Sequence, residues 1–140
     1  MKNKNNQTIK AGCFLVNRET RKIAIIYREK QKDYSFPKGH LEENETLIEC
    51  ALRETAEETK RDGNILDETP IIDIYKTGKG EECICYYYIA EDIGKSDNTS
   101  TDTHNLVWID IDKVEEVLTY PHLIDFYKNV KDKILKLIND

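Results

Sequence analysis

The stretch from Gly39 to Glu58, GHLEENETLIECALRETAEE, constrains what this chain can form more than any other segment. It contains seven glutamates and one arginine, so its formal charge of −6 equals that of the whole 140-residue chain, and the remainder is formally neutral. On an ideal helix Glu54, Glu57 and Glu58 share one face, which adjoins the apolar face instead of opposing it. A surface helix ordinarily keeps its charges away from its apolar stripe. The pattern therefore predicts carboxylates at the edge of a buried surface.

Two interpretations of these carboxylates fit their spacing. Glu54 and Glu58 are like charges one turn apart, which mildly destabilises an isolated helix. A divalent cation would reverse that effect, because Mg²⁺ prefers oxygen ligands and is commonly held by one or two carboxylates together with substrate phosphates. A solvated acidic face would show the same spacing.

The length of 140 residues predicts a single domain, residues 1–140, in which the polar residues 1–7 are expected to be frayed. Hydrophobic residues make up 39% and charged residues 34%, a balance typical of globular proteins. The apolar runs are short and none follows the N-terminal lysines, so we expect neither a membrane span nor a signal peptide. The net negative charge argues against a general nucleic-acid or anionic-membrane partner.

The cysteines indicate a reducing compartment. The chain has four of them, Cys13, Cys50, Cys83 and Cys85. The only close pair is Cys83 and Cys85, and no second pair or histidine pair stands at zinc-finger spacing. We therefore expect four reduced, mostly buried thiols and a cytoplasmic protein.

Hydrophobic periodicity predicts strands that come in hairpins, with one helix between them and two after them. The expected strands are Ile9–Val16, Lys22–Arg28, Ile71–Thr77, Glu82–Glu91 and Leu106–Ile111. The expected helices run from Thr46 to about Lys60 with Asn44 or Thr46 as its cap, over Lys113–Leu118 with Asp112 as its cap, and from Pro121 onward. Tyr34–His40 and Gly94–Thr103 are expected to be loops, and Gly63 is expected to end the first helix in a left-handed conformation. This order favours an α+β fold with a mixed sheet.

The acidic segment contains a recognisable spacing. Gly39, Glu45, the pair Arg53–Glu54 and the pair Glu57–Glu58 closely resemble the signature of the Nudix hydrolases, a match that spans Gly39 to Glu58. The resemblance implies the family's α/β/α sandwich, a mixed β-sheet with a catalytic helix and a C-terminal helix. It also implies hydrolysis of a phosphoanhydride bond in a nucleoside diphosphate linked to a further group, with Mg²⁺ or Mn²⁺ as the cofactor.

The same resemblance implies the metal ligands. They would be the backbone carbonyl of Gly39 and the carboxylates of Glu54, Glu57 and Glu58. A polyphosphate could not approach so many carboxylates unless cations neutralised the charge, and bound metal ions also lower the pKa of a bound water.

Catalytic roles are implied for Glu54, as the general base, and for Arg53 and Glu57. Arg53 would orient the carboxylates through charge-assisted hydrogen bonds. Glu45 would brace the neighbouring loop and Arg53.

Three positions depart from the family's pattern. Thr55 stands where the family usually has an aliphatic residue, and Lys60 and Arg61 stand where it usually has Gly and an aliphatic residue. The metal-ligand set is complete, so we expect activity to survive, with Gly63 supplying the turn at the helix exit.

The family often recruits one more acid or base from a loop near the substrate. Asp102 and His104, shortly before Trp108, are candidates here, as are Glu81 and Glu82. An exposed loop charge is the competing interpretation of each.

Shorter matches bear on the substrate. The run FPKGHLE at residues 36–42, the segment 51–55 and CICYYYIAED at residues 83–92 resemble the asymmetrical diadenosine tetraphosphate hydrolases. This resemblance implies cleavage of diadenosine tetraphosphate to ATP and AMP. Lys38 and His40 could meet phosphates at the loop, and Lys76 or Lys79 could supply a second cation, although solvated turn lysines would look the same.

The aromatic residues have two possible roles, stacking on a nucleotide base and packing in the hydrophobic core. On a strand, Tyr87 faces opposite to Tyr86 and Tyr88 and could stack on an adenine, although strand tyrosines more often serve packing. We read Trp108 and Phe126 as core residues.

Other functions are compatible with the same motif. The alternative enzymes are a nucleoside triphosphate sanitising pyrophosphatase and an RNA 5′ pyrophosphohydrolase, and the −6 charge argues against long RNA. A nucleotide-sensing domain without activity is the non-enzymatic alternative, which the complete set of Glu54, Glu57 and Glu58 disfavours. We expect a small nucleotide as the partner and a monomer or homodimer.

Overall fold

Two long strands, β1 (Thr8–Asn17) and β7 (Glu82–Lys95), run parallel in the middle of the sheet and organise the rest of the fold. In the computed structural model, which describes residues 1–139, eight strands form one mixed sheet. All the other strand pairs are antiparallel. The other strands are β2 (Lys22–Arg28) and β4 (Lys38–His40) beside β1, β5 (Arg61–Ile65) and β6 (Ile71–Lys76) beside β7, and β3 (Asp33–Ser35) and β8 (Asn105–Asp110) beside β2.

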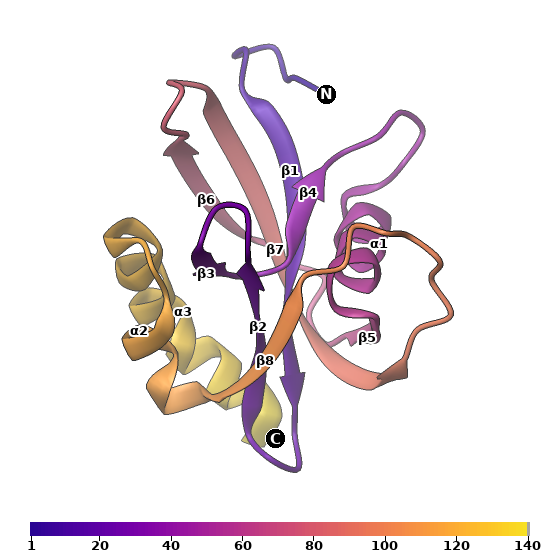
Figure 1. Cartoon of the computed structure of the whole chain (residues 1–140), viewed down its shortest axis with the longest axis vertical. Helices are drawn as coiled ribbons and strands as arrows, with labels where there is room; N and C mark the ends of the chain where they lie inside the picture. The colour runs from indigo at the N-terminus through magenta and orange to yellow at the C-terminus, as the bar shows by residue number, and fades with distance from the viewer. Residues whose placement is uncertain (140) are drawn as a thin grey trace.

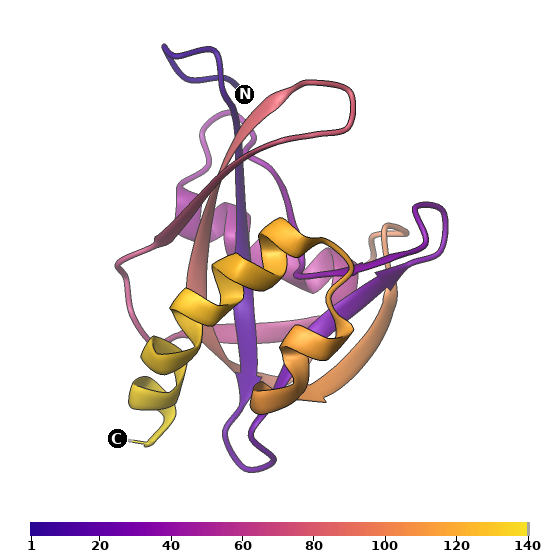
Figure 2. The same ribbon diagram turned by 90° about the vertical axis from the view of Figure 1, so that its left-hand side faces the viewer.

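The helices cover both faces of this sheet. Figure 1 shows α1 (Leu47–Thr59) on one side and α2 (Val114–Val117) with α3 (Pro121–Asn139) on the other, and Figure 2 shows α3 lying across its face. A 3₁₀ turn, Ile111–Lys113, links β8 to α2. The predicted α+β fold, an α/β/α sandwich with a C-terminal helix, is confirmed.

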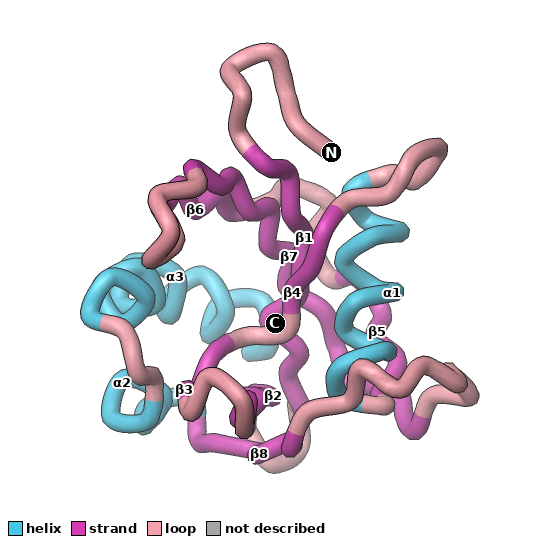
Figure 3. Tube along the Cα trace, turned by 45° about the horizontal axis from the view of Figure 1, so that its top comes forward, coloured by secondary structure: helices cyan, strands magenta, loops and turns pink. Residues whose placement is uncertain are grey.

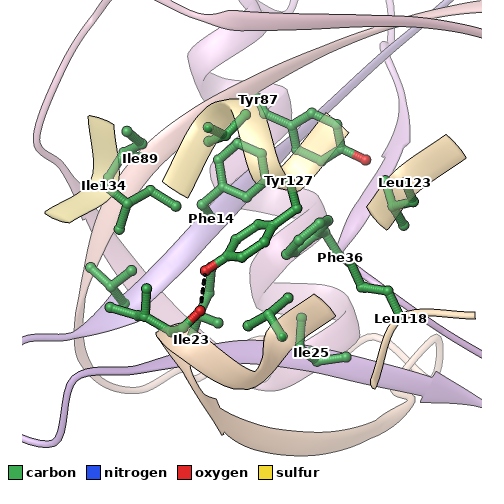
Figure 4. Packing of buried hydrophobic residues seen from close by; sticks show 14 of the residues in the cluster. Phe14, Ile23, Ile25, Phe36, Tyr87, Ile89, Leu118, Leu123, Tyr127 and Ile134 are labelled. Atoms are coloured by element: carbon green, nitrogen blue, oxygen red, sulfur yellow. Dashed lines mark hydrogen bonds between the residues drawn. The ribbon is translucent and has the colours of Figure 1, made fainter. Parts of the chain in front are cut away.

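The strand β1 contributes side chains to both hydrophobic cores, because successive residues of a strand point to opposite faces of the sheet. Phe14 and Val16 enter the larger core under α3, and Cys13 and Leu15 enter the smaller core under α1. In the larger core the hydroxyl of Tyr127 donates a hydrogen bond to the backbone oxygen of Ile111 at 2.8 Å (Figure 4). A strand buried on both faces fixes the relative positions of the two helix layers.

The acidic helix begins where the sequence predicts. Thr46 caps it, with a capping box in which the Thr46 hydroxyl accepts from the Glu49 amide and the Glu49 carboxylate accepts from the Thr46 amide. The helix ends at Lys60, which is left-handed with φ of 59°. The prediction that Gly63 makes this turn is wrong. Gly63 lies in β5, where a Cβ would be 3.1 Å from Leu15 Cδ1 and 3.2 Å from Ala90 Cβ, so the packing around it is tight.

Other local expectations need correction. The predicted loop 34–40 contains parts of β3 and all of β4, and β7 continues to Lys95 into the loop expected from Gly94. Asp112 caps no helix with its side chain, because it lies within the 3₁₀ turn, and its exposed carboxylate pairs with Lys131 at 3.0 Å.

The N-terminal residues 1–7, predicted to be frayed, form a hydrogen-bonded turn against β1. The Asn3 side-chain oxygen accepts the amides of Asn5 and Gln7, and the Ile9 amide donates to the Met1 oxygen at 2.8 Å. Gln7 is buried. Asparagine side chains that bond nearby backbone amides stabilise such turns, which the composition argument overlooked.

All four cysteines are free and buried, as predicted. Trp108 and Phe126 are only partly buried, each packed against one of the two cores. None of the helices in residues 1–139 combines the length and the hydropathy that a membrane crossing requires.

Candidate active site

Arg53 is the centre of the acidic cluster on α1. Its Nε and Nη2 donate to both Glu45 oxygens, at 2.6 and 3.0 Å, and its Nη1 donates to Glu54 at 2.8 Å and to Glu57 at 3.2 Å. Nη2 also donates to the His40 backbone oxygen at 3.0 Å, which ties the end of β4 to the helix. The Arg53 guanidinium holds the pKa of Glu45 below its ordinary value. These are the contacts that orienting and bracing roles for Arg53 and Glu45 require.

Glu54 and Glu58 lie on the buried side of this cluster. Their side chains are 14% and 13% exposed, and burial raises the pKa of Glu54. Burial likewise raises the pKa of Glu58 to about 8, although the Lys38 amide donates to its Oε1 at 2.9 Å. The carboxylates therefore sit at the edge of the apolar face, where their negative charge is costly without a cation.

Gly39 lies directly against Glu54. A Cβ at Gly39 would be 2.0 Å from Glu54 Cδ, so the carboxylate occupies the space that any side chain would need. This contact brings the Gly39 backbone and the Glu54 carboxylate to the same point, as a shared metal site would require.

Residues 96–104, which connect β7 to β8, pass over the C-terminal end of α1 (Figures 1 and 3). The His104 amide donates to the Glu58 backbone oxygen at 3.0 Å, and His104 Nε2 lies 3.7 Å from Glu58 Oε2. Burial lowers the pKa of His104. Asp102 is exposed, and its charge contributes to the raised pKa of Glu54. Both loop candidates therefore lie near the carboxylates.

Glu81 and Glu82 lie elsewhere. Glu81 accepts a hydrogen bond from the Thr8 hydroxyl at 2.8 Å, and Glu82 accepts one from the Gln7 side-chain amide at 2.7 Å. These acids hold the N-terminal turn, which argues against a part in the acidic cluster.

The donor atoms of this cluster suit a hard divalent cation. The Gly39 carbonyl and three glutamates offer only oxygen, which Mg²⁺ and Mn²⁺ accept. Within residues 1–139, however, no three acidic, histidine or cysteine side chains converge as a ready metal cluster. Arg53 instead engages Glu54 and Glu57. A metal ion would fit the chemistry of the donors and would have to take oxygen atoms from Arg53.

A pocket of about 580 Å³ opens on the other face of β4, between the sheet and the start of α3. Its lining is rich in cations and tyrosines, namely Lys10, Arg28, Lys38, Lys76, Tyr75, Tyr87 and Tyr120. The Lys10 and Lys38 ammonium groups lie 5.7 and 6.0 Å from the Tyr75 ring centre, and neither makes an ion pair within residues 1–139. Three hydroxyls of lining residues, those of Ser35, Tyr75 and Tyr87, are buried, and within residues 1–139 their only nearby polar partners are the weakly bonding thiols of Cys83, beside Tyr75, and Cys85, beside Tyr87. Unpaired cations and hydroxyls in one pocket are suited to a polar anionic ligand.

Tyr120, just before α3, and His122, in its first turn, fix the pocket walls. The Tyr120 hydroxyl donates to Asp33 at 2.6 Å, and Arg28 binds the same carboxylate through two hydrogen bonds. His122 Nε2 lies 2.6 Å from the buried Asp73 carboxylate.

The pocket and the acidic cluster meet at Lys38. Its amide bonds Glu58, and its side chain enters the pocket, where burial lowers its pKa.

Only some of the predicted substrate-binding residues lie at the pocket. Lys38 lines the pocket, whereas His40 is exposed on β4 and Lys79 is exposed in the turn between β6 and β7. Tyr87 cannot offer its ring to a base, because it is fully buried and stacks on Phe14 with ring centres 4.8 Å apart. Figure 4 shows the ring among the core residues; Tyr87 belongs to the pocket lining, but its hydroxyl is buried as well.

Sequence reasoning missed Lys10, Arg28, Tyr75 and His122 as pocket residues. One pattern in the sequence indicates two of the lining residues. Side chains alternate along β6, so Asp73 and Tyr75 share the face opposite the exposed Ile72 and Ile74.

Comparisons of the sequence and of the structure with known proteins point to the same family. The NUDIX domain family matches residues 6–130. The 8-oxo-(d)GTP phosphatase of Mycolicibacterium smegmatis is 30% identical over 102 residues, 73% of this chain and 31% of that protein. The mRNA-decapping enzyme subunit 2 of Saccharomyces cerevisiae is 23% identical over 117 residues, 83% of this chain and 12% of that protein. This chain thus spans less than a third of these relatives. The crystal structure of the C. elegans Ap4A hydrolase superposes with a TM-score of 0.69 at 17% identity, covering 93% of this chain and 98% of that one.

Proposed function

The chain belongs to the Nudix hydrolase family, and on that premise we propose that it hydrolyses a phosphoanhydride bond in a nucleoside polyphosphate. The first candidate substrate is diadenosine tetraphosphate, cleaved to ATP and AMP. The observation that carries the proposal is the pocket with the unpaired lysines Lys10 and Lys38, which meets the acidic cluster at Lys38.

Glu54, Glu57, Glu58 and the Gly39 carbonyl would hold Mg²⁺ or Mn²⁺. When bound, the metal would neutralise polyphosphate charge and acidify an attacking water. Arg53 keeps Glu54 and Glu57 oriented through its hydrogen bonds, and Glu45 keeps Arg53 in place.

Glu54 would accept the proton of the attacking water. Burial raises the pKa of Glu54, which makes the ionised carboxylate a stronger base. His104 and Asp102 are further candidates for proton transfer, because the loop that carries them lies over the end of α1.

The pocket would bind the phosphates and nucleoside that lie beyond the metal. Its volume of about 580 Å³ suits a nucleotide portion, within the roughly 300–1,000 Å³ of small-molecule sites. Lys10 and Lys38 would pair with phosphate oxygens, and the hydroxyls of Ser35, Tyr75 and Tyr87 would receive hydrogen-bonding partners. A cationic pocket on one side of the acidic cluster supports a substrate whose phosphate chain continues past the cleaved bond.

An oxidised purine nucleoside triphosphate is the second candidate, which the similarity to the Mycolicibacterium phosphatase favours. RNA 5′ ends rank lower, because the formal charge of −6 supplies no extended basic track. A cytoplasmic location and a monomer or homodimer stay predictions.

The test is a product analysis. The protein is incubated with Mg²⁺ and, separately, diadenosine tetraphosphate, 8-oxo-dGTP, ordinary nucleoside triphosphates, ADP-ribose and triphosphorylated RNA, with Glu57→Gln as the matched control. ATP and AMP from the tetraphosphate support the first candidate, whereas two ADP contradict it. Preferred cleavage of 8-oxo-dGTP supports the second candidate. Metal binding without turnover of any compound would instead favour a nucleotide sensor.

A further inference from the structure

Lys60 occupies an unusual position at the end of α1. The family signature that the sequence resembles has Gly there, and the Lys60 backbone adopts the left-handed conformation that suits Gly, with φ of 59°. The backbone requirement of the motif is thus retained at a residue that carries a side chain.

That side chain reaches the loop formed by residues 96–104. The Lys60 ammonium donates to the Asn98 oxygen at 3.1 Å and to the Ser100 oxygen. Both acceptors are backbone carbonyls, so the contact fixes the path of the loop and does not depend on the rotamers of its side chains.

The same loop covers the end of the helix through its backbone and one hydroxyl. The Ser96 amide donates to the Lys60 oxygen at 2.9 Å, the Thr103 hydroxyl to the Glu57 oxygen at 3.3 Å, and the His104 amide to the Glu58 oxygen at 3.0 Å. These bonds satisfy carbonyls that a helix end leaves without partners. They anchor the two ends of the loop, and Lys60 holds its middle.

We infer that Lys60 is a positioning residue, which holds the 96–104 loop so that Asp102 and His104 stay beside Glu54 and Glu58. A glycine would preserve the helix end but could not bind Asn98 and Ser100. This inference rests on the proposed function, because it assigns the loop a part in turnover.

The test separates the ammonium from the backbone conformation. Lys60→Gly removes the side chain and favours the left-handed conformation, and Lys60→Met keeps most of the aliphatic stem without the charge. Lys32→Gly is the matched control, because Lys32 is an exposed lysine with φ of 56° in the turn between β2 and β3. Hydrogen exchange of the amides in residues 97–103 is measured together with kcat and KM.

We expect exchange in the loop to accelerate by about tenfold or more in both Lys60 variants, since a hydrogen bond to a charged group is lost. We expect kcat to fall about 10- to 100-fold with KM little changed, because misplaced groups lower turnover while the pocket is intact. Lys60→Arg should recover most of both properties, and Lys32→Gly should match the wild type.

Unchanged loop exchange in Lys60→Gly would overturn the inference, and so would faster exchange with unchanged kcat. A wild type that cleaves none of the nucleotides would overturn the proposed function and, with it, the role in turnover. In that case the exchange data alone would still decide whether Lys60 holds the loop.

Discussion

Gly39 and Glu54 are in such close contact that a methyl group on Gly39 would lie 2.0 Å from the carboxylate carbon of Glu54. The obstacle is the end of a flexible side chain, which can move away at little cost to the fold. Gly12, on β1, presents the opposite case, since its added Cβ would lie 2.1 Å from the Pro37 backbone oxygen.

The first prediction follows from this difference. Gly39→Ala should displace the Glu54 carboxylate and lower kcat by about 10²-fold, with little change in Tm. Gly12→Ala should instead destabilise the protein by about 1–3 kcal/mol, because backbone must move. Thermal melts and kinetics of the two variants check this, and a Gly39→Ala enzyme with normal kcat would contradict it.

The glutamates of the helix provide the second prediction. Glu57→Gln and Glu58→Gln should each lower turnover by about 10²–10³-fold or more, because each loses a negative charge that would hold the catalytic metal ion. The fold should survive, since glutamine keeps the size and an acceptor oxygen. Circular dichroism and steady-state rates with Mg²⁺ measure both effects, and near wild-type rates in both variants would refute the assignment.

The raised pKa of Glu58 predicts a pH-dependent stability. The pKa rises from 4.5 to about 8 in the fold, so the unfolded chain ionises first and stability falls as pH rises between these values. In EDTA, Glu58→Gln should therefore match the wild type at pH 4 and melt at a higher temperature at pH 9. A gain of several degrees is expected, because 1 kcal/mol corresponds to about 3–5 °C in a chain of this size. Adding Mg²⁺ at pH 9 should stabilise the wild type more than the variant, and equal melting temperatures at pH 9 in EDTA would contradict the prediction.

Substrate binding provides the fourth prediction. Lys38→Met should raise KM about 10- to 100-fold, because a charge-assisted bond to a phosphate is lost. Lys128→Met, on the exposed side of α3, serves as the control. Equal KM values for the two variants would remove Lys38 from the binding site.

The fifth prediction concerns Thr55, which replaces the family's usual aliphatic residue. Thr55 is fully buried, and its hydroxyl lacks a satisfactory hydrogen bond, with the Cys13 thiol as a nearby polar group. Thr55→Val should stabilise the fold by about 1 kcal/mol, because an unsatisfied buried hydroxyl is removed. Thr59→Val should destabilise it, since the Thr59 hydroxyl donates to the Thr55 oxygen at 2.6 Å and accepts the Arg61 amide at 3.1 Å. Denaturant melts of both variants decide the sign.

The acidic helix was predictable because its information is local. The Thr46 cap, the apolar spacing and the glutamate positions all lie within one segment, and the burial of Glu54 and Glu58 follows from their place at the edge of the apolar face. The helix exit was not predictable, because a left-handed backbone is uncommon at any residue other than glycine, and nothing in the local sequence marks Lys60 for it.

The pocket could not be predicted, because its lining residues are far apart in the sequence. Its walls come from six strands, β1, β2, β3, β4, β6 and β7, and from the start of α3, which only the tertiary fold brings together. Three-residue strands such as β3 and β4 also carry too few residues for a period to be visible. Strand alternation correctly predicts that Tyr87 points to the opposite face of the sheet from Tyr86 and Tyr88. It cannot predict that α3 covers that face and buries the Tyr87 ring.

Because all four thiols are buried, their reactivity reports local unfolding of the structure around each of them. Burial raises the pKa of Cys13, Cys50 and Cys85 to about 12, so thiol reagents will scarcely react until the surrounding structure separates. Cys50 lies on the acidic helix, Cys13 on β1, and Cys83 and Cys85 on β7. Cys13 and Cys50 lie in the smaller core under α1, whereas Cys85 lies in the larger core under α3. The order in which an alkylating reagent modifies them would therefore reveal whether α1 or α3 leaves the sheet first, without any engineered label.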